Sequence, residues 1–156
     1  MPRSRDGRRT TIVVRQREVP VGRLTEDAKR VLAQTKVIPV ATASKEGLPN
    51  VVPMTFVKTL DDSTVLIADN FMDKGARNLE ENPHVSVCVW NLETKRAYQI
   101  RGDVEIHRSG TVYDEMVAWV KETKPDAPAK AAVVMTVTNV FVCHSGDDRG
   151  KDVVLQ

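Results

Sequence analysis

The sequence predicts a mainly β protein, an antiparallel barrel with helices inserted between some of its strands. Val-rich runs such as AAVVMTVTNVFV favour strands, because β-branched side chains suit a pleated, half-buried surface. Only short turns, at Lys45–Gly47 and Leu60–Ser63, separate the first three of these runs. Parallel neighbours would need long crossover connections, so an antiparallel barrel is favoured over a doubly wound sheet.

Length and composition indicate one folded domain. The 156 residues, 41% of them hydrophobic and 28% charged, are enough for a single core and exclude general disorder. Residues 1–23 hold seven arginines against two acidic residues, although the net charge of the whole chain is only +2. We therefore predict a basic N-terminal arm over residues 1–23 and a single domain over residues 24–156.

The expected elements follow from hydrophobic periodicity and turn residues. Six strands are expected, at Val37–Ala43, Asn50–Lys58, Thr64–Ala68, His84–Trp90, Ala97–His107 and Ala131–Val142. Three helices are expected, over residues 25–34, 74–81 and 109–124. Thr25 is a suitable N-cap for the first helix, and Pro83 would end the second. Trp119 falls on the apolar stripe of the third helix, so we expect it to pack in the core.

Several functional classes have no support in the sequence. Nothing at the N-terminus resembles a signal peptide, and no apolar run approaches the roughly 20 residues that cross a bilayer, so a cytoplasmic protein is expected. Motifs of the forms GxGxxG, GxSxG and HExxH and a P-loop are missing. Cys88 and Cys143 lie in alternating apolar runs, so we expect two buried thiols and no metal site. The arm lacks aromatic residues for base stacking, which makes nucleic-acid binding an unfavoured hypothesis.

The stretch DNFMDKGARN, Asp69 to Asn78, has the chemistry to bind a phosphate. A polar loop leads into a helix N-terminus, where free N–H groups and the helix dipole attract anions. Lys74 adds a positive charge, and Gly75 permits a close approach of the backbone. The alternative is that Asp73 caps the helix and Lys74 is solvated, and the local chemistry alone favours that alternative.

Four separated motifs support the phosphate hypothesis. They are VIPVATASKEGLPNVVPMTFV, TVLIADNFMDK, RNLEENPHVSVCVW and YQIRGDVEI, in this order. From about Leu24 to Asp152 the chain resembles the pyridoxamine 5'-phosphate oxidase-related family of FMN-binding split barrels. The resemblance implies a six-stranded antiparallel split β-barrel and a homodimer in which each flavin contacts both chains. It also implies an FMN-dependent oxidoreductase, with a substrate that the sequence does not reveal.

Matching positions of the family imply the cofactor-binding residues. The second strand would run along the isoalloxazine edge, the end of the third would adjoin it, and a later strand would supply a Gln. The basic phosphate ligand would come from the start of the second helix. The implied set is Val52, Pro53, Met54, Thr55, Ala68, Asp69, Asn70, Lys74, Gly75 and Gln99.

The chain departs from the family pattern in two places. True oxidases have an Arg-Lys pair where this chain reads Lys74-Gly75, with Asp73 beside it in place of a small hydroxyl residue. The hydroxyls of Thr42 or Thr55 are candidates for making up the lost phosphate contacts. The chain ends in GKDVVLQ, without the Trp- and Arg-containing segment that grips flavin and pyridoxal phosphate. We therefore do not expect oxidation of pyridoxamine phosphate.

Other hypotheses stay open from the sequence. Relatives of this barrel bind deazaflavin or haem, and the longer acidic tail of a deazaflavin would need further basic groups such as Lys58 or Arg77. A non-catalytic flavin carrier and a binding module that uses the arm are also compatible. No residue stands out as a catalytic acid, base or nucleophile, because His84, His107 and His144 are each expected at the surface or at a strand edge.

Overall fold

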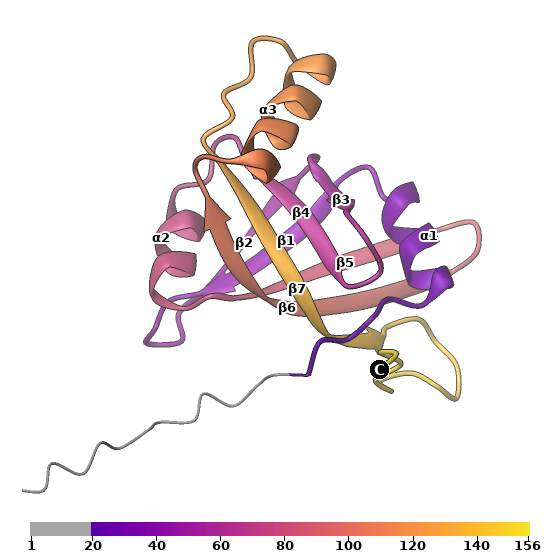
Figure 1. Cartoon of the computed structure of the whole chain (residues 1–156). Helices are drawn as coiled ribbons and strands as arrows, with labels where there is room; N and C mark the ends of the chain where they lie inside the picture. The colour runs from indigo at the N-terminus through magenta and orange to yellow at the C-terminus, as the bar shows by residue number, and fades with distance from the viewer. Residues whose placement is uncertain (1–19) are drawn as a thin grey trace, which may run out of the picture.

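The computed structural model describes residues 20–156, so most of the predicted basic arm lies outside the described part (Figure 1). The strands are β1 (Ile38–Ala43), β2 (Pro49–Met54), β3 (Val57–Thr59), β4 (Thr64–Asp69), β5 (His84–Asn91), β6 (Arg96–His107) and β7 (Ala131–Val142). The helices are α1 (Glu26–Gln34), α2 (Lys74–Glu81) and α3 (Thr111–Thr123). In this part of the chain, no helix is both long enough and apolar enough to cross a membrane.

All seven strands form one sheet in the order β2-β1-β5-β6-β7-β4-β3, and every neighbouring pair is antiparallel. The two edge strands, β2 and β3, follow one another in the chain with only Thr55 and Phe56 between them. Because so short a link keeps the two edges close together, the sheet curls into a barrel that is split between them. The predicted fold class, an antiparallel split barrel with inserted helices, is confirmed.

The strand expected over Asn50–Lys58 is broken in two, which makes the number of strands seven instead of six. Met54 and Val57 both pack against the core inside the barrel, whereas Phe56 belongs to a second apolar cluster outside it. Residues three apart in a continuous strand would point to opposite faces. The regular alternation therefore has to slip at Thr55 and Phe56, and the strand ends there.

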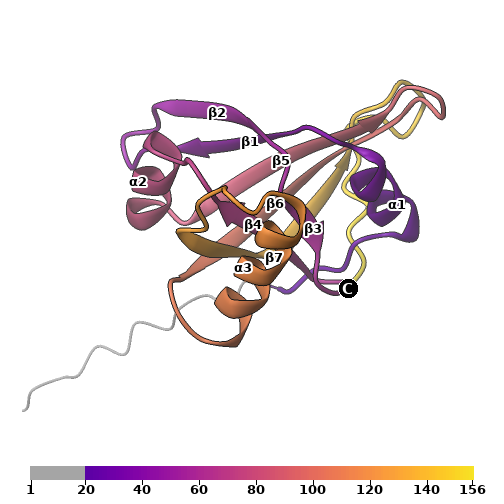
Figure 2. The same cartoon turned by 90° about the horizontal axis from the view of Figure 1, so that it is seen from above.

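The core consists of two apolar clusters. The larger one fills the barrel with the inward side chains of all seven strands, together with the apolar faces of α1 and α2. The smaller one lies between α3 and the outer face of β4 and β7, where Leu66, Ala68 and Ala132 meet Met116 and Val120. Figure 2 shows α1 and α2 at opposite ends of the barrel and α3 beside β7.

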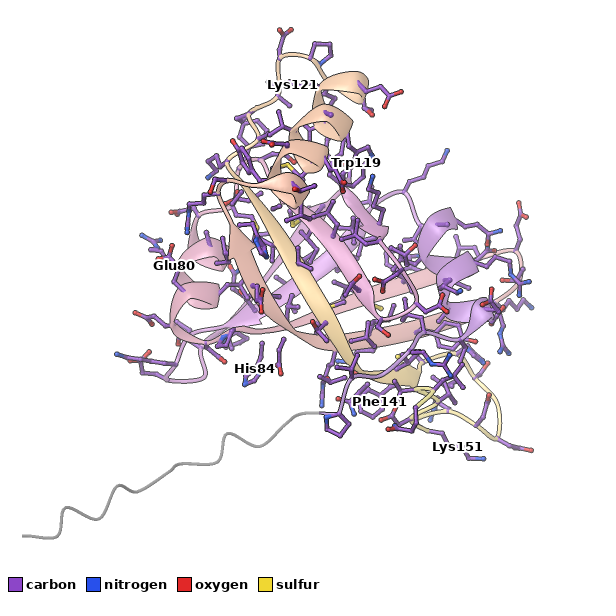
Figure 3. The ribbon with its side chains drawn as sticks, viewed as in Figure 1. Glu80, His84, Trp119, Lys121, Phe141 and Lys151 are labelled. Atoms are coloured by element: carbon purple, nitrogen blue, oxygen red, sulfur yellow. The ribbon has the colours of Figure 1, made fainter. Side chains whose placement is uncertain are left out.

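Two sequence signals define helix ends as predicted. The Oγ1 of Thr25 accepts a hydrogen bond from the N–H of Ala28 at 3.1 Å, which caps α1. Helix α2 ends at Glu81, two residues before Pro83. Trp119 is half-buried, and its ring meets that of Phe56 edge-on with a centroid separation of 5.2 Å, so it packs at the margin of the smaller cluster (Figure 3).

The β6–β7 ladder shifts register between Arg101 and Gly102. A Cβ atom at Gly102 would lie 2.3 Å from the carbonyl oxygen of Thr136 and 2.4 Å from Cγ of Met135. Real side chains do not approach so closely, so only glycine fits at this irregularity. The glycine of the YQIRG motif is thus explained by packing within the sheet.

Two predictions about single residues are wrong. Cys143, which directly follows the end of β7, is exposed, and Cys88 is half-buried. Burial, with a smaller contribution from Cys143, raises the pKa of the Cys88 thiol, which keeps it protonated.

His144 is buried instead of lying at the surface, since the chain after β7 folds back and packs it against the ring of Tyr98. His84 is exposed, as expected (Figure 3).

Candidate functional site

A cavity of about 390 Å³ lies between β2, the loop before α2 and the segment that connects α3 to β7. It is lined by Asn50, Val52, Pro53, Met54, Thr55, Phe56, Asn70, Phe71, Met72, Asp73, Lys74, Gly75, Lys124 and Ala127. This lining combines an apolar body with a few polar groups and two ammonium groups. Small organic ligands bind in cavities of this size and composition.

The first wall is β2, an edge strand. Its partner β1 pairs with it so that Pro39 lies opposite Pro53, and Val40 lies opposite Val52. Proline has no N–H to donate, so the Pro39–Pro53 pair is one of the pairs without ladder hydrogen bonds. The outer edge of β2 therefore offers the cavity mainly carbonyl oxygens, and Pro53 protects this edge from pairing with another strand.

The second wall is the N-terminus of α2. Asp73 occupies the N-cap position but makes no side-chain capping bond, and its Oδ2 instead pairs with Arg77 at 3.2 Å. Within residues 20–156, the backbone N–H groups of Lys74, Gly75 and Ala76 have no acceptor. The alternative is thus wrong only in its capping bond, because Asp73 holds the N-cap position and Lys74 is exposed as that alternative expects. The first turn leaves its donors available for an anion.

Gly75 brings this helix end close to the barrel. A Cβ atom at Gly75 would lie 3.0 Å from Cε of Met72 and 3.6 Å from Nδ2 of Asn50. Beneath the helix, the buried Oγ1 of Thr42 accepts a hydrogen bond from Nδ2 of Asn78 at 3.0 Å. Thr42 therefore anchors α2 to β1, and Thr55 is the predicted hydroxyl that lines the cavity.

Polar contacts of Asp69 and Asn70 fix the loop from Asp69 to Met72. The Oδ1 of Asp69 accepts a hydrogen bond from the N–H of Met72 at 3.0 Å and lies 3.4 Å from Nζ of Lys130. Asn70 lines the cavity, and its Nδ2 donates to the carbonyl oxygen of Pro128 at 2.7 Å. Asp69 thus shapes the loop, and the fully buried Ala68 lies under α3.

The third wall is formed by the end of α3 and its connection to β7, where three lysines lie. Lys121 donates to the carbonyl oxygens of Pro125 at 3.1 Å and Ala127 at 2.6 Å. Lys130 donates to the carbonyl oxygen of Met72 at 2.8 Å. Lys124 lines the cavity, and its Nζ lies 5.7 Å from the centroid of the Phe56 ring. The segment is fixed by two lysines, while the third faces the cavity.

Gln99 lies apart from the cavity, on the outer face of β6. It is paired with Cys88 on β5 and Phe141 on β7, and its Nε2 donates to Oγ of Ser86 at 2.9 Å. Val51 and Ala41 continue the same outer face across β2 and β1. In Figure 2, all three helices lie on one side of β1 and β2, so no helix covers this face there.

The structure brings together most of the predicted cofactor-binding residues. Val52, Pro53, Met54, Thr55, Asn70, Lys74 and Gly75 line the cavity, whereas Ala68, Asp69 and Gln99 do not. The predicted set did not include the other lining residues, Asn50, Phe56, Phe71, Met72, Asp73, Lys124 and Ala127. The strand pattern indicated Asn50, because it shares a face with Val52. No signal indicated Lys124, which lies about 50 residues after α2 begins.

The fold is an antiparallel split barrel, and its cavity is lined by groups that can bind an anion, namely Lys74 and the start of α2. The model of the family described as pyridoxamine 5'-phosphate oxidase matches residues 24–144. The chain therefore belongs to the pyridoxamine 5'-phosphate oxidase family. Within residues 20–156 no group of three or more His, Cys, Asp or Glu side chains is placed to hold a metal ion.

Two proteins similar in sequence and one solved structure of similar fold match this chain. An uncharacterized protein of Methanocaldococcus jannaschii, MJ0282, is 39% identical over 133 residues, which cover 84% of this chain and 88% of that protein. The heme oxygenase HutZ of Vibrio cholerae is 36% identical over 74 residues, 47% of this chain and 41% of HutZ. The crystal structure of an FMN-binding protein from Syntrophomonas wolfei aligns with a TM-score of 0.69 at 15% identity, over 78% of this chain and 86% of that one, which shows a shared fold.

Proposed function

We propose that this protein binds FMN in the cleft between β2 and α2 and acts as an FMN-dependent oxidoreductase. The observation that carries the proposal is the start of α2, which has no side-chain cap: Lys74 and Gly75 line a cavity of about 390 Å³, and the N–H groups of the first turn have no acceptor among the described residues. A phosphate suits this end, because the helix dipole, the unpaired donors and the ammonium group all favour an anion. Val52, Met54 and Phe56 give the cavity an apolar wall for an aromatic ring.

Bound FMN would supply the hydride and electron chemistry, while this chain binds and orients it. The cavity lining contains a single carboxylate, Asp73, and that carboxylate is paired with Arg77. With no imidazole or thiol in the described lining, the protein's own groups supply binding and orientation. An alternative within the same proposal is a protein that carries FMN without catalysing a reaction. Turnover assays with electron donors and acceptors distinguish an oxidoreductase from such a carrier.

The proposal includes a homodimer. The outer face of β1, β2, β5 and β6 presents Val51, with 64% of its surface exposed, beside Ala41 and Cys88. A second copy packed on this face would cover these apolar groups. Gln99 lies on the same face and outside its own chain's cavity, which supports the proposal that it reaches the flavin of the other copy.

Haem is a weaker candidate, although a partial relative is a heme oxygenase. Iron in haem is usually held by a His, Cys, Tyr or Met side chain. His84, His107 and His144 all lie outside the cavity, and only Met54 and Met72 line it. The only iron ligands in the described lining are therefore thioether sulfurs. An anionic flavin could instead bind the ammonium group of Lys74 and the free backbone N–H groups of α2.

The direct test is an absorbance spectrum of the purified protein, followed by titration with FMN, deazaflavin and haem. Flavin bands and the tightest binding for FMN are expected. Colourless protein that does not take up FMN, or tighter binding of deazaflavin or haem, would contradict the proposal.

Lys74→Ala tests the phosphate contact. Loss of a charge-assisted hydrogen bond costs about 1.5–3 kcal/mol, so we expect FMN affinity to fall about 10- to 150-fold in fluorescence titrations. Lys45→Ala, in the exposed β1–β2 turn outside the cavity, is the matched control and should bind FMN like the original chain. Unchanged affinity in Lys74→Ala would place the phosphate elsewhere.

A further inference from the structure

The cavity lining holds a second ammonium group, that of Lys124, besides Lys74. Lys74 and Gly75 lie beside Asn50, at the start of β2. Lys124 lies beside Phe56, just after β2 ends. Strand β2 runs from Pro49 to Met54, so Asn50 and Met54 are separated by about 13 Å at roughly 3.3 Å per residue, and Phe56 follows after the break in the strand. The two ammonium groups therefore belong to opposite ends of β2 and can each meet a different anion.

Lys124 also differs from the two lysines that flank it in the chain. The ammonium groups of Lys121 and Lys130 are engaged by carbonyl oxygens, which fixes the path of the α3–β7 connection. Among residues 20–156, no acceptor lies within hydrogen-bond distance of Nζ of Lys124 and no carboxylate lies within 4 Å of it. Its contact is with the face of the Phe56 ring. The fixed segment therefore places the exposed side chain of Lys124 at the cavity, without an ion-pair partner among these residues.

The surroundings of Lys124 favour a small ligand with an apolar body. Phe56 is 6% exposed, and Met54 and Ala127 line the cavity nearby. The only carboxylate of the lining, Asp73, lies on the α2 side and is paired with Arg77. No negative charge of the lining therefore competes at the end where Lys124 lies.

We propose that Lys124 is a second anion-binding group of the cleft, which holds the carboxylate or phosphate of a small-molecule substrate that enters from the α3 side. This inference rests on the proposed function, because it assigns the Lys74 end to the flavin phosphate and the Lys124 end to the substrate. The substrate class is an acid with an apolar or aromatic body.

Benzoate, with benzamide as its uncharged isostere, is a suitable probe. The full-length ¹⁵N-labelled protein is titrated with each compound, flavin-free and loaded with FMN, and amide shifts are followed by NMR. We expect benzoate to shift the amides of Phe56 and Ala127 in both forms and benzamide to have little effect. Lys124→Ala should weaken benzoate binding about tenfold or more, Lys124→Arg should restore part of it, and Lys45→Ala should leave it unchanged.

Four results would each overturn the proposal. They are equal benzoate affinity in Lys124→Ala, equal binding of benzamide, shifts confined to Lys74 and Gly75, and no shifts at all. FMN binding by Lys124→Ala, measured in parallel, should stay within about twofold of the original chain, since the phosphate lies at the other end; a larger loss would assign Lys124 to the cofactor. Failure of the original chain to bind FMN would overturn the proposed function alone, because the flavin-free titration still reports on Lys124.

Discussion

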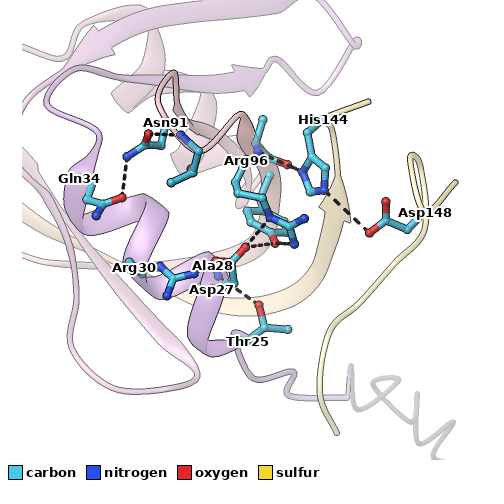
Figure 4. Close-up of polar contacts among 12 residues, drawn as sticks. Thr25, Asp27, Ala28, Arg30, Gln34, Asn91, Arg96, His144 and Asp148 are labelled. Atoms are coloured by element: carbon cyan, nitrogen blue, oxygen red, sulfur yellow. Dashed lines mark hydrogen bonds and ion pairs between the residues drawn. The ribbon is translucent and has the colours of Figure 1, made fainter. Parts of the chain in front are cut away.

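Asp27→Asn is expected to destabilise the protein in a pH-dependent way. Asp27 lies in the first turn of α1, and its Oδ2 accepts a hydrogen bond from Nε of Arg96 at 2.8 Å and another from the hydroxyl of Tyr98 (Figure 4). Its Oδ1 pairs with Arg30. Burial opposes ionisation, but the hydrogen bonds from Tyr98, Arg96 and Arg30 outweigh it and lower the pKa of Asp27 from 3.8 to about 2.

The size of the effect follows from proton linkage. Lowering a pKa from 3.8 to about 2 corresponds to about 2.4 kcal/mol of free energy of unfolding at neutral pH. The side chain is 22% exposed, so the full value is an upper bound. Because the folded-state pKa is depressed, the stabilisation is complete above about pH 5 and is lost as the pH falls through the folded value. About 1.3 kcal/mol should remain at pH 3 and about 0.4 kcal/mol at pH 2.

Urea unfolding of both proteins at several pH values measures the difference. Asp27→Asn should be less stable by about 2 kcal/mol at pH 7 and nearly equal to the original chain at pH 2. Asp62→Asn is the control, because its carboxylate pairs directly with Lys29 at 2.6 Å but is exposed at the surface, so its loss should matter far less. A stability gap for Asp27→Asn that is the same at pH 7 and pH 2, or an equally large effect of Asp62→Asn, would refute the reasoning.

Two further substitutions test the sheet and the dimer. Gly102→Ala should lower the free energy of unfolding by about 1–3 kcal/mol, since its Cβ would lie 2.3 Å from the carbonyl oxygen of Thr136; an unchanged urea midpoint would show that the sheet relaxes freely. Ala41→Glu should give a monomer in sedimentation velocity with weaker FMN retention, because it places a charge on the proposed dimer face, whereas Thr111→Glu at the exposed start of α3 should leave a dimer. A dimeric Ala41→Glu would contradict the assignment of that face.

Local signals predicted much of the fold. The alternation of Val85, Val87 and Val89 with more polar neighbours predicted β5, and these three valines are buried. Pro83 marked the end of α2, and Thr25 marked the start of α1. These predictions hold because each depends on one side-chain period or one backbone restriction that acts over a few residues.

Other features depend on contacts between distant segments. The break at Thr55 and Phe56 arises because Phe56 packs against α3, whose residues follow about 60 positions later. His144 is buried because the chain after β7 folds back against Tyr98. No local pattern encodes either contact, so the sequence predicted a continuous strand in one case and a surface histidine in the other.

The sequence alone determined the family, the barrel and the position of Lys74 at the start of a helix, since motifs and periodicity are properties of short segments. The tertiary structure decided which side chains share the cleft. It placed Lys124 beside Phe56, moved Ala68, Asp69 and Gln99 out of the lining, and left the α2 donors free by pairing Asp73 with Arg77. The physical reason is that a cavity forms where walls from separate elements meet, and their meeting is fixed only when the core packs.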